Sequence, residues 1–138
     1  MDGTGVDWEA LLQAAAAARE RSYAPYSGFR VGAALLAEDG RIYAGCNVEN
    51  RSFGLAVCAE RSAVAQAVAA GAGRPLAVAV VADTSPPARP CGMCLETLSE
   101  FAPDLPILLA NLSGERDEVT LRGLLPQPFQ WPGARPGA

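Results

Sequence analysis

The sequence has no apolar run long enough to cross a membrane, and its first residues, MDGTGVDWEALLQ, are acidic rather than basic. We therefore expect a cytoplasmic protein with no membrane partner. An excess of positive charge is also missing, because the net charge is −4 and the eleven arginines are scattered along the chain. A protein that binds nucleic acid normally carries a basic stripe, so no nucleic acid partner is expected. The negative net charge is compatible with a small neutral substrate.

Histidine and lysine are both absent from the chain. The missing lysine, together with abundant Ala, Gly, Pro and Arg, reflects base composition, and we attach no function to it. Without histidine, a metal site would depend on cysteine and carboxylate side chains. Cysteines of cytoplasmic proteins are metal ligands or catalysts more often than disulfide partners. The four cysteines are therefore the first candidates for a functional site.

Half of the 138 residues are hydrophobic and 19% are charged, which is typical of a globular chain. This length predicts one domain, residues 1–138, with a Pro-rich C-terminal tail over 126–138. Hydrophobic periodicity and turn residues predict, in chain order, a helix over 7–22, a hairpin within 29–50 that turns at Asp39-Gly40, a helix over 58–70, a strand over 75–83, a helix over 91–101, a strand over 105–111 and a short element within 117–126. This alternation predicts a three-layer α/β/α domain.

Three cysteines lie at the starts of two predicted helices. Cys58 falls in the first turn of one helix, and Cys91 and Cys94 fall in the first turn of the next. The N-terminus of a helix carries partial positive charge, which favours thiolates. Both helices follow strands, so their first turns can meet at one edge of the sheet. Three thiolates at that edge suit a soft, tetrahedral Zn²⁺ site.

Three protein ligands leave one position of a tetrahedral zinc open, which is typical of a catalytic site. Water bound at that position can have a pKa of about 7 and supply a nucleophile at neutral pH. Glu60, two residues after Cys58, can act there as a proton shuttle rather than as a ligand. The residues therefore favour a catalytic zinc site.

Other interpretations of the cysteines stay open on the residues alone. The pair Cys91 and Cys94 also fits a redox motif or one half of a structural zinc site. A redox pair is expected after an early strand and would leave Cys58 without a role. A structural site normally needs a fourth ligand, and Cys46 could supply it, although its place at a strand end favours a buried thiol.

The segments CNVEN, FGLAVCAERSAV and PCGMC, in this order and spacing, resemble the cytidine deaminase family of small, homo-oligomeric, zinc-dependent nucleoside deaminases. The resemblance extends from YAPYSGFRVGAAL to LLPQPF and so covers most of the chain. It implies a central mixed sheet of about five strands in the three-layer sandwich. It also implies one Zn²⁺ per chain, bound by Cys58, Cys91 and Cys94, with Glu60 as the catalytic acid and base.

The resemblance further implies hydrolytic deamination of cytidine and deoxycytidine to uridine and deoxyuridine, with release of ammonia, in pyrimidine salvage. An alternative substrate is a modified cytosine nucleoside, as in the related blasticidin S deaminases, although the retained Asn47 and Glu49 favour an ordinary ribose. A non-catalytic, zinc-stabilised binding protein is the alternative outside enzymes. Deamination of polynucleotides is disfavoured by the acidic charge and by the lack of insertions that could form a strand-binding channel. The sequence does not rank cytidine against deoxycytidine.

Two residues of CNVEN match positions that bind ribose in the family. By this resemblance Asn47 and Glu49 hold the 3′-hydroxyl, whereas by themselves they fit a solvated strand end. The backbone N–H of Ala59 matches a contact to the base carbonyl. Phe29 matches an aromatic residue that packs on the pyrimidine, although a core phenylalanine would look the same.

Two more aromatic residues and an arginine complete the implied site. Phe53 stands where the family usually carries tyrosine, which keeps stacking and loses a hydroxyl contact. Phe129 matches an aromatic that reaches a neighbouring subunit, so a homotetramer with shared sites is implied; a tail folded back on its own domain is the alternative. Arg61 matches an arginine that hydrogen-bonds the ligand sulfurs and offsets their charge, although composition alone favours an exposed helix arginine.

One departure from the family pattern follows Cys94. The chain has Leu95-Glu96 where the family commonly has Arg-Gln. A positive residue is thus replaced by a neutral one, and a neutral residue by an acid. We expect either a rebuilt environment around the site or a difference in efficiency or oligomer contacts.

Overall fold

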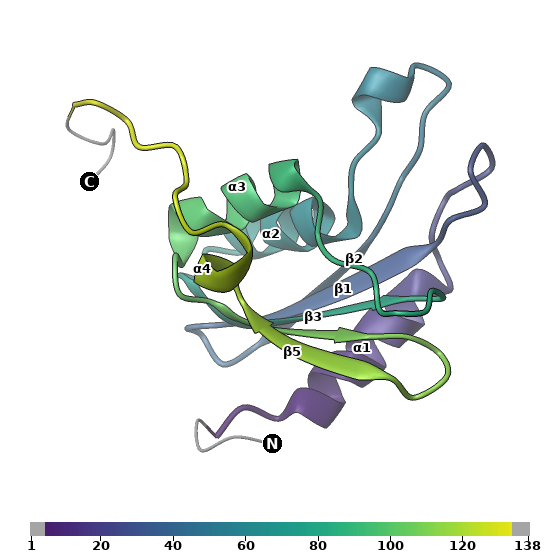
Figure 1. The fold of residues 1–138 in the computed structure, drawn as a ribbon, viewed down its shortest axis with the longest axis horizontal. Coiled ribbons are helices and arrows are strands. Elements are labelled where there is room, and N and C mark those ends of the chain that lie inside the picture. The colour runs from purple at the N-terminus through teal and green to yellow at the C-terminus, as the bar shows by residue number, and fades with distance from the viewer. Residues whose placement is uncertain (1–4, 134–138) are drawn as a thin grey trace.

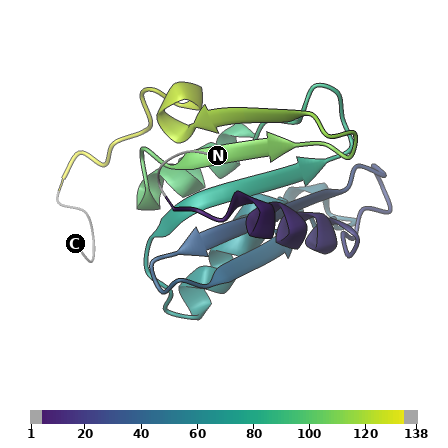
Figure 2. The same cartoon turned by 90° about the horizontal axis from the view of Figure 1, so that it is seen from below.

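The computed structural model describes residues 5–133 as a five-stranded sheet with helices on both faces (Figure 1 and Figure 2). The last five residues of the predicted tail 126–138 lie outside the described residues. The elements in chain order are α1 (Trp8–Arg19), β1 (Val31–Ala37), β2 (Ile42–Cys46), the 3₁₀ helix η1 (Phe53–Leu55), α2 (Ala59–Ala69), β3 (Pro75–Ala82), α3 (Gly92–Phe101), β4 (Pro106–Ala110), β5 (Arg116–Thr120) and α4 (Leu121–Leu124). Within residues 5–133, no helix has the length and apolar character that a membrane span requires.

The strand order of the sheet is β2-β1-β3-β4-β5. The pair β3–β4 is parallel and the other neighbouring pairs are antiparallel, so the sheet is mixed. The β1–β2 hairpin turns at Asp39-Gly40, where Gly40 has a φ of 81°, a backbone conformation that favours glycine. The Asp39 carboxylate accepts a hydrogen bond from the N–H of Arg41 at 2.9 Å, which closes the turn.

The helix α1 covers one face of the sheet (Figure 1). Asp7 caps its first turn by accepting a hydrogen bond from the N–H of Ala10. The buried side chains Trp8, Leu11 and Leu12 pack in one cluster with strand residues of β1, β3 and β4. Most of these strand residues are alanines, so the bulky helix side chains fill the space that they leave.

The helices α2 and α3 lie on the opposite face (Figure 1). Gly45 of β2 lies directly against α2, because a Cβ atom at this position would be 2.5 Å from the N atom of Ala63 and 2.8 Å from the carbonyl oxygen of Ala59. Only glycine permits so close an approach. This contact fixes the first turns of α2, and with them Cys58, against the end of β2.

The predicted three-layer α/β/α sandwich with a mixed five-stranded sheet is confirmed. The strand β3 is buried along its length except at Leu76, as its continuous apolar run predicts. The predicted end of the first helix at residue 22 is wrong, since α1 ends at Arg19. The short element predicted within 117–126 is in fact most of β5 followed directly by α4. β5 has the sequence RDEVT and lies at the edge of the sheet. Because three of these five residues are charged, a search for hydrophobic runs does not detect the strand.

Candidate metal centre and active site

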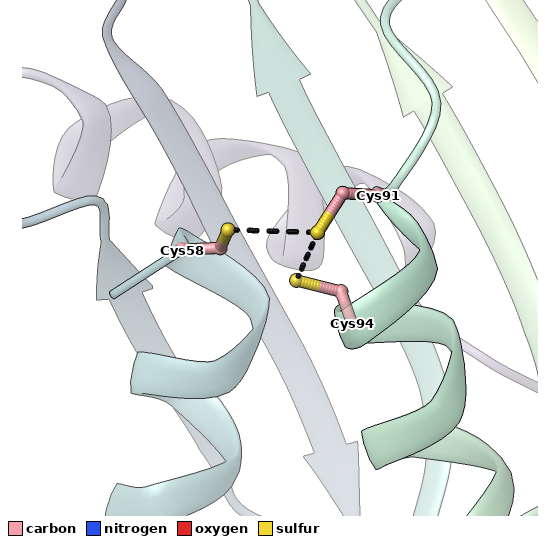
Figure 3. A group of neighbouring side chains, drawn as sticks. All are labelled: Cys58, Cys91 and Cys94. Atoms are coloured by element: carbon pink, nitrogen blue, oxygen red, sulfur yellow. Dashed lines mark hydrogen bonds between the residues drawn. The ribbon is translucent and has the colours of Figure 1, made fainter. Parts of the chain in front are cut away.

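The thiols of Cys58, Cys91 and Cys94 converge between the starts of α2 and α3 (Figure 3). Cys58 is the N-cap residue of α2, Cys91 is the N-cap residue of α3, and Cys94 lies in the first turn of α3. The Sγ atom of Cys91 is 3.7 Å from that of Cys58 and 3.4 Å from that of Cys94. The structure therefore brings together the three cysteines that the sequence places at helix starts.

This donor set fits a zinc ion. Tetrahedral Zn–S bonds of about 2.3 Å place two sulfurs about 3.8 Å apart. The sulfurs of Cys91 and its two neighbours already lie at 3.4 and 3.7 Å, and all three sulfurs lie within 4.8 Å of one another. Thiolates are soft ligands that zinc accepts readily, and three of them leave a fourth position available.

The electrostatics of the group favour a thiolate at Cys58. The neighbouring thiol of Cys94 and a hydrogen bond from Arg61 lower the pKa of Cys58 to about 5. The pKa of Cys94 is raised, because its thiol lies beside Cys58 and is partly desolvated. A metal ion that binds all three sulfurs as thiolates therefore displaces the proton of Cys94.

Arg61 lies against the thiols and not in open solvent. Its Nη2 atom is 3.9 Å from Sγ of Cys58 and donates a hydrogen bond to the carbonyl of Ala56 at 3.2 Å. Its Nε atom is buried and has no hydrogen-bond partner among residues 5–133. The guanidinium is therefore placed where it can offset negative charge on the sulfur of Cys58.

Glu60 is buried in the first turn of α2, with 5% of its surface exposed. This burial raises the pKa of Glu60, and the negative charge of Cys58 adds to the effect. A buried carboxyl beside a group of metal-ligating side chains is a candidate for proton transfer.

Asn47, the residue after β2, is held by a network that the sequence does not reveal. Its Oδ1 atom accepts hydrogen bonds from the N–H of Val31 at 2.8 Å and from the hydroxyl of Ser22 at 2.5 Å. Its Nδ2 atom donates to the carbonyl of Phe29 at 2.7 Å. The amide has two N–H donors, and this network uses one of them. A simple solvated strand end is thereby excluded for Asn47.

Glu49 binds the loop that precedes β1. Its Oε1 atom accepts hydrogen bonds from the N–H groups of Tyr26 at 2.9 Å and Ser27 at 3.2 Å, and its Oε2 atom accepts one from the Ser27 hydroxyl. The hydrogen bond from the Ser27 hydroxyl is the main reason why the pKa of Glu49 is lowered. These three residues line a cavity of about 320 Å³ together with Asn50, Phe53 and Ala56.

The three aromatic residues of the implied site are exposed, with 45% of Phe29, 74% of Phe53 and 71% of Phe129 accessible. A core role for Phe29 is thereby excluded. The ring of Phe53 meets that of Tyr26 edge to face, with the ring centroids 5.6 Å apart. The N–H of Phe129 donates to Oε1 of Glu96 at 3.2 Å, so the tail contacts α3 through its backbone and leaves its ring in solvent.

The structure also shows the environments of Cys46, the possible fourth ligand, and of Leu95, which follows Cys94. Cys46, at the end of β2, lies outside the three-thiol group and is half-buried rather than fully buried. Leu95, in place of the family's arginine, is a buried core residue of α3.

Sequence reasoning missed Ser22, Tyr26 and Ser27 as residues that hold Asn47 and Glu49. The motif YAPYSGF contained a signal for Ser27 alone, because it places a serine hydroxyl in the loop just before the strand that follows Phe29. Ser22 precedes the motif, and Tyr26 contributes its backbone N–H.

A mixed three-layer domain with three thiols at two helix starts, and a buried carboxyl beside them, is the arrangement expected of a zinc-dependent hydrolytic enzyme. Comparisons with known proteins identify the family. The family model of the cytidine and deoxycytidylate deaminase zinc-binding region matches residues 6–108.

Relatives and solved structures agree with this match. The cytidine deaminase of Sporosarcina psychrophila is 49% identical over 125 residues, which cover 90% of this chain and 92% of the relative. The cytidine deaminase of Halalkalibacterium halodurans is 46% identical over 125 residues, covering 90% and 95%. The crystal structure of cytidine deaminase from Burkholderia pseudomallei has a TM-score of 0.86 at 46% identity and covers 90% of this chain and 100% of that one. The chain therefore belongs to the cytidine and deoxycytidylate deaminase family, and its cofactor is zinc.

Proposed function

We propose that the chain catalyses the zinc-dependent hydrolytic deamination of cytidine and deoxycytidine to uridine and deoxyuridine, with release of ammonia, in pyrimidine salvage. The observation that carries this proposal is the three-thiol group with the buried Glu60 beside it. Family membership supports the reaction type, and the relatives named cytidine deaminase support the substrate.

Cys58, Cys91 and Cys94 would hold one zinc ion per chain, since their sulfurs have the chemistry and the spacing that zinc requires. When bound, zinc supplies the Lewis acid that makes water nucleophilic at neutral pH. Arg61 donates to Cys58 and so offsets part of the charge of three thiolates. Cys46 takes no part in the site.

Glu60 would move the protons of the reaction. Its carboxylate accepts a proton from the attacking water and passes a proton to N3 of the cytosine ring, which makes C4 electrophilic. C4 gains the water oxygen, and the C4–N bond then breaks. Glu60 delivers the second water proton to the departing amine, so that cytidine and water become uridine and ammonia. The burial of Glu60 supports this role because it separates proton transfer from bulk water.

Ala59 and Phe29 would bind the base. The N–H of Ala59 lies in the first turn of α2, where helical N–H groups have no partner within the helix. It can therefore donate to the C2 carbonyl of the base, which lies across N3 from the attacked carbon C4. The exposed ring of Phe29 offers an apolar face for the pyrimidine.

Asn47 and Glu49 would bind one sugar hydroxyl between them. The Asn47 amide has an N–H left to donate, and Oε2 of Glu49 has acceptor capacity beyond its hydrogen bond with Ser27. A hydroxyl is both a donor and an acceptor, so a single ribose hydroxyl can satisfy both side chains. This pairing favours an ordinary ribose over the modified nucleosides that blasticidin S deaminases use.

The enzyme would work as a cytoplasmic homotetramer with sites shared between subunits, built from one domain over residues 1–138 and without a nucleic acid or membrane partner. Phe53 and Phe129 support the shared site, because both rings are exposed on a single chain and would be covered by a neighbour. The net charge of −4 supports the absence of a polyanionic partner.

Conversion of cytidine to uridine by purified protein, followed by ultraviolet absorbance with ammonia measured in parallel, tests the proposed function. We expect equal amounts of uridine and ammonia. A zinc-loaded, folded sample that converts neither cytidine nor deoxycytidine would contradict the proposal and would favour a zinc-stabilised binding protein.

A further inference from the structure

Ser27 connects two residues of the proposed nucleoside site. It lies in the loop between α1 and β1, and its Oγ atom donates a hydrogen bond to Oε2 of Glu49. The same Oγ atom accepts a hydrogen bond from the N–H of Phe29 at 2.9 Å. A hydroxyl has one hydrogen and two lone pairs, so both contacts can exist at once. One small side chain thus joins the carboxylate proposed for the sugar to the backbone that carries the ring proposed for the base.

Of the three hydrogen bonds that Glu49 accepts, two go to Oε1 and one goes to Oε2. A carboxylate offers about four lone-pair positions, two on each oxygen. The N–H groups of Tyr26 and Ser27 occupy Oε1, and the Ser27 hydroxyl occupies one position of Oε2. One acceptor position of Oε2 then remains available, and Glu49 is one of the residues that line the cavity.

The Ser27 hydroxyl is the contact that fixes the orientation of Oε2. The terminal torsion of a glutamate side chain is broad, and two hydrogen bonds to Oε1 hold that oxygen but still allow the carboxylate to tilt about it. The two backbone donors to Oε1 do not depend on the side chain of residue 27, whereas the contact to Oε2 does. Removing the hydroxyl therefore changes one hydrogen bond to Glu49 and keeps the other two.

We propose that Ser27 is a positioning residue for sugar recognition, whose hydroxyl turns the remaining acceptor position of Glu49 Oε2 toward a ribose hydroxyl. This inference rests on the proposed function of the site. Ser27 acts through Glu49 and takes no part in the chemistry at C4.

The test compares Ser27→Val with Ser27→Thr, two side chains of the same shape that differ in the hydroxyl. Ser52→Ala is the matched control, because Ser52 lies in the loop beside Phe53 and its side chain makes no capping hydrogen bond to η1. We expect Ser27→Val to raise KM for cytidine about tenfold, the size of one hydrogen bond to a charged group, and to change kcat less than about twofold. Ser27→Thr and the control should resemble the unmodified enzyme.

A substrate without ring hydroxyls separates positioning from a general structural effect. The KM for 2′,3′-dideoxycytidine should be the same in Ser27→Val and in the unmodified enzyme, because this substrate offers Glu49 no hydroxyl. In a Glu49→Ala background, Ser27→Val should raise the KM for cytidine no further. Equal losses on both substrates, additive effects of the two substitutions, or a Ser27→Thr variant as weak as Ser27→Val would each overturn the inference.

The controls distinguish this inference from the function on which it rests. Circular dichroism and zinc content show whether each variant is folded, and Ser27→Ala replaces Ser27→Val if the bulkier side chain disrupts the loop. An unmodified enzyme that converts cytidine, with Ser27→Val or Ser27→Ala indistinguishable from Ser52→Ala, overturns the inference and leaves the proposed function intact. A zinc-loaded unmodified chain that fails to convert cytidine overturns both.

Discussion

Cys58, Glu60 and Arg61 lie within four consecutive positions at the start of α2, and each has a different environment. Cys58 points to the other thiols, Glu60 is buried, and Arg61 donates to the sulfur of Cys58. The N-cap and the first turn of one helix therefore present a thiol, a buried carboxyl and a guanidinium on the same side of the sheet, for which we propose the roles of metal ligand, proton carrier and compensating charge. Because each of these side chains has a different environment, a single substitution can test one proposed role at a time.

Glu60→Gln should remove most of the activity and keep the metal. The amide has nearly the shape of the carboxyl group but cannot carry a proton, and general acid–base groups contribute about 10²- to 10⁴-fold. We expect kcat to fall in that range, with zinc content and circular dichroism unchanged. Near-normal turnover in this variant would remove Glu60 from the mechanism.

At the residue scale, the sequence predicts the contacts that are close along the chain. Cys91 and Cys94 share a helical turn, and Cys58 and Glu60 share another, so their grouping follows from helix geometry and the order of strands. The partners of Asn47 could not be predicted in the same way. Ser22 is 25 residues away, and its hydrogen bond depends on the conformation of an irregular loop.

At the scale of elements, the position of α2 on the sheet depends on its closest contact with β2. Gly45→Ala would place a methyl group 2.5 Å from the N atom of Ala63, which is closer than nonbonded atoms allow. Either α2 or β2 must shift, and overpacking of this kind typically costs about 1–3 kcal/mol.

Gly45→Ala should therefore lower the free energy of unfolding by about this amount and weaken zinc binding, because Cys58 moves with α2. Gly54→Ala is the control, since a Cβ at Gly54 meets nothing within 4 Å. Urea denaturation and competition with a zinc chelator measure the two effects. A Gly45→Ala variant as stable as Gly54→Ala would show that this contact does not fix α2.

Elements with strong hydrophobic patterns are also the ones that the sequence predicts well. β3 has a continuous apolar run and is found close to its expected limits. α1 has a clear apolar stripe and begins where expected, but it ends at Arg19 and not at residue 22. β5 is an edge strand in which exposed residues alternate with half-buried ones. Its sequence is too polar to predict a strand, and the strand is recognised by its pairing with β4. The division of 117–126 into a strand and a helix therefore requires tertiary contacts.

At the scale of the whole molecule, the segment of residues 125–133 leads from α4 away from the sheet (Figure 1). Its backbone is attached to α3 where Glu96 accepts the N–H of Phe129, so Glu96, the acid that departs from the family pattern, contacts the tail. Phe129 and Trp131 remain exposed, with 71% and 61% of their surfaces accessible. Exposed aromatic residues on an anchored segment are suited to bind a neighbouring subunit.

Truncation after Pro126 should lower activity more than it lowers zinc content. The truncated chain loses Phe129 and Trp131 and keeps every residue of the metal site, so the expected defect is in enclosure of the nucleoside. Sedimentation and kcat/KM for cytidine, measured with zinc content on the same sample, check this expectation. A fully active monomer, whether truncated or complete, would contradict the shared site and leave the zinc chemistry unaffected.

The central claim is that a zinc ion held by Cys58, Cys91 and Cys94 carries the deamination of cytidine. The most direct test measures turnover while zinc is removed with a chelator and returned in known amounts, with Cys46→Ala as the control variant. We expect turnover to rise in proportion to bound zinc up to one ion per chain, both in the unmodified enzyme and in Cys46→Ala. Turnover that persists in zinc-free protein, or loss of zinc from Cys46→Ala, would contradict the account.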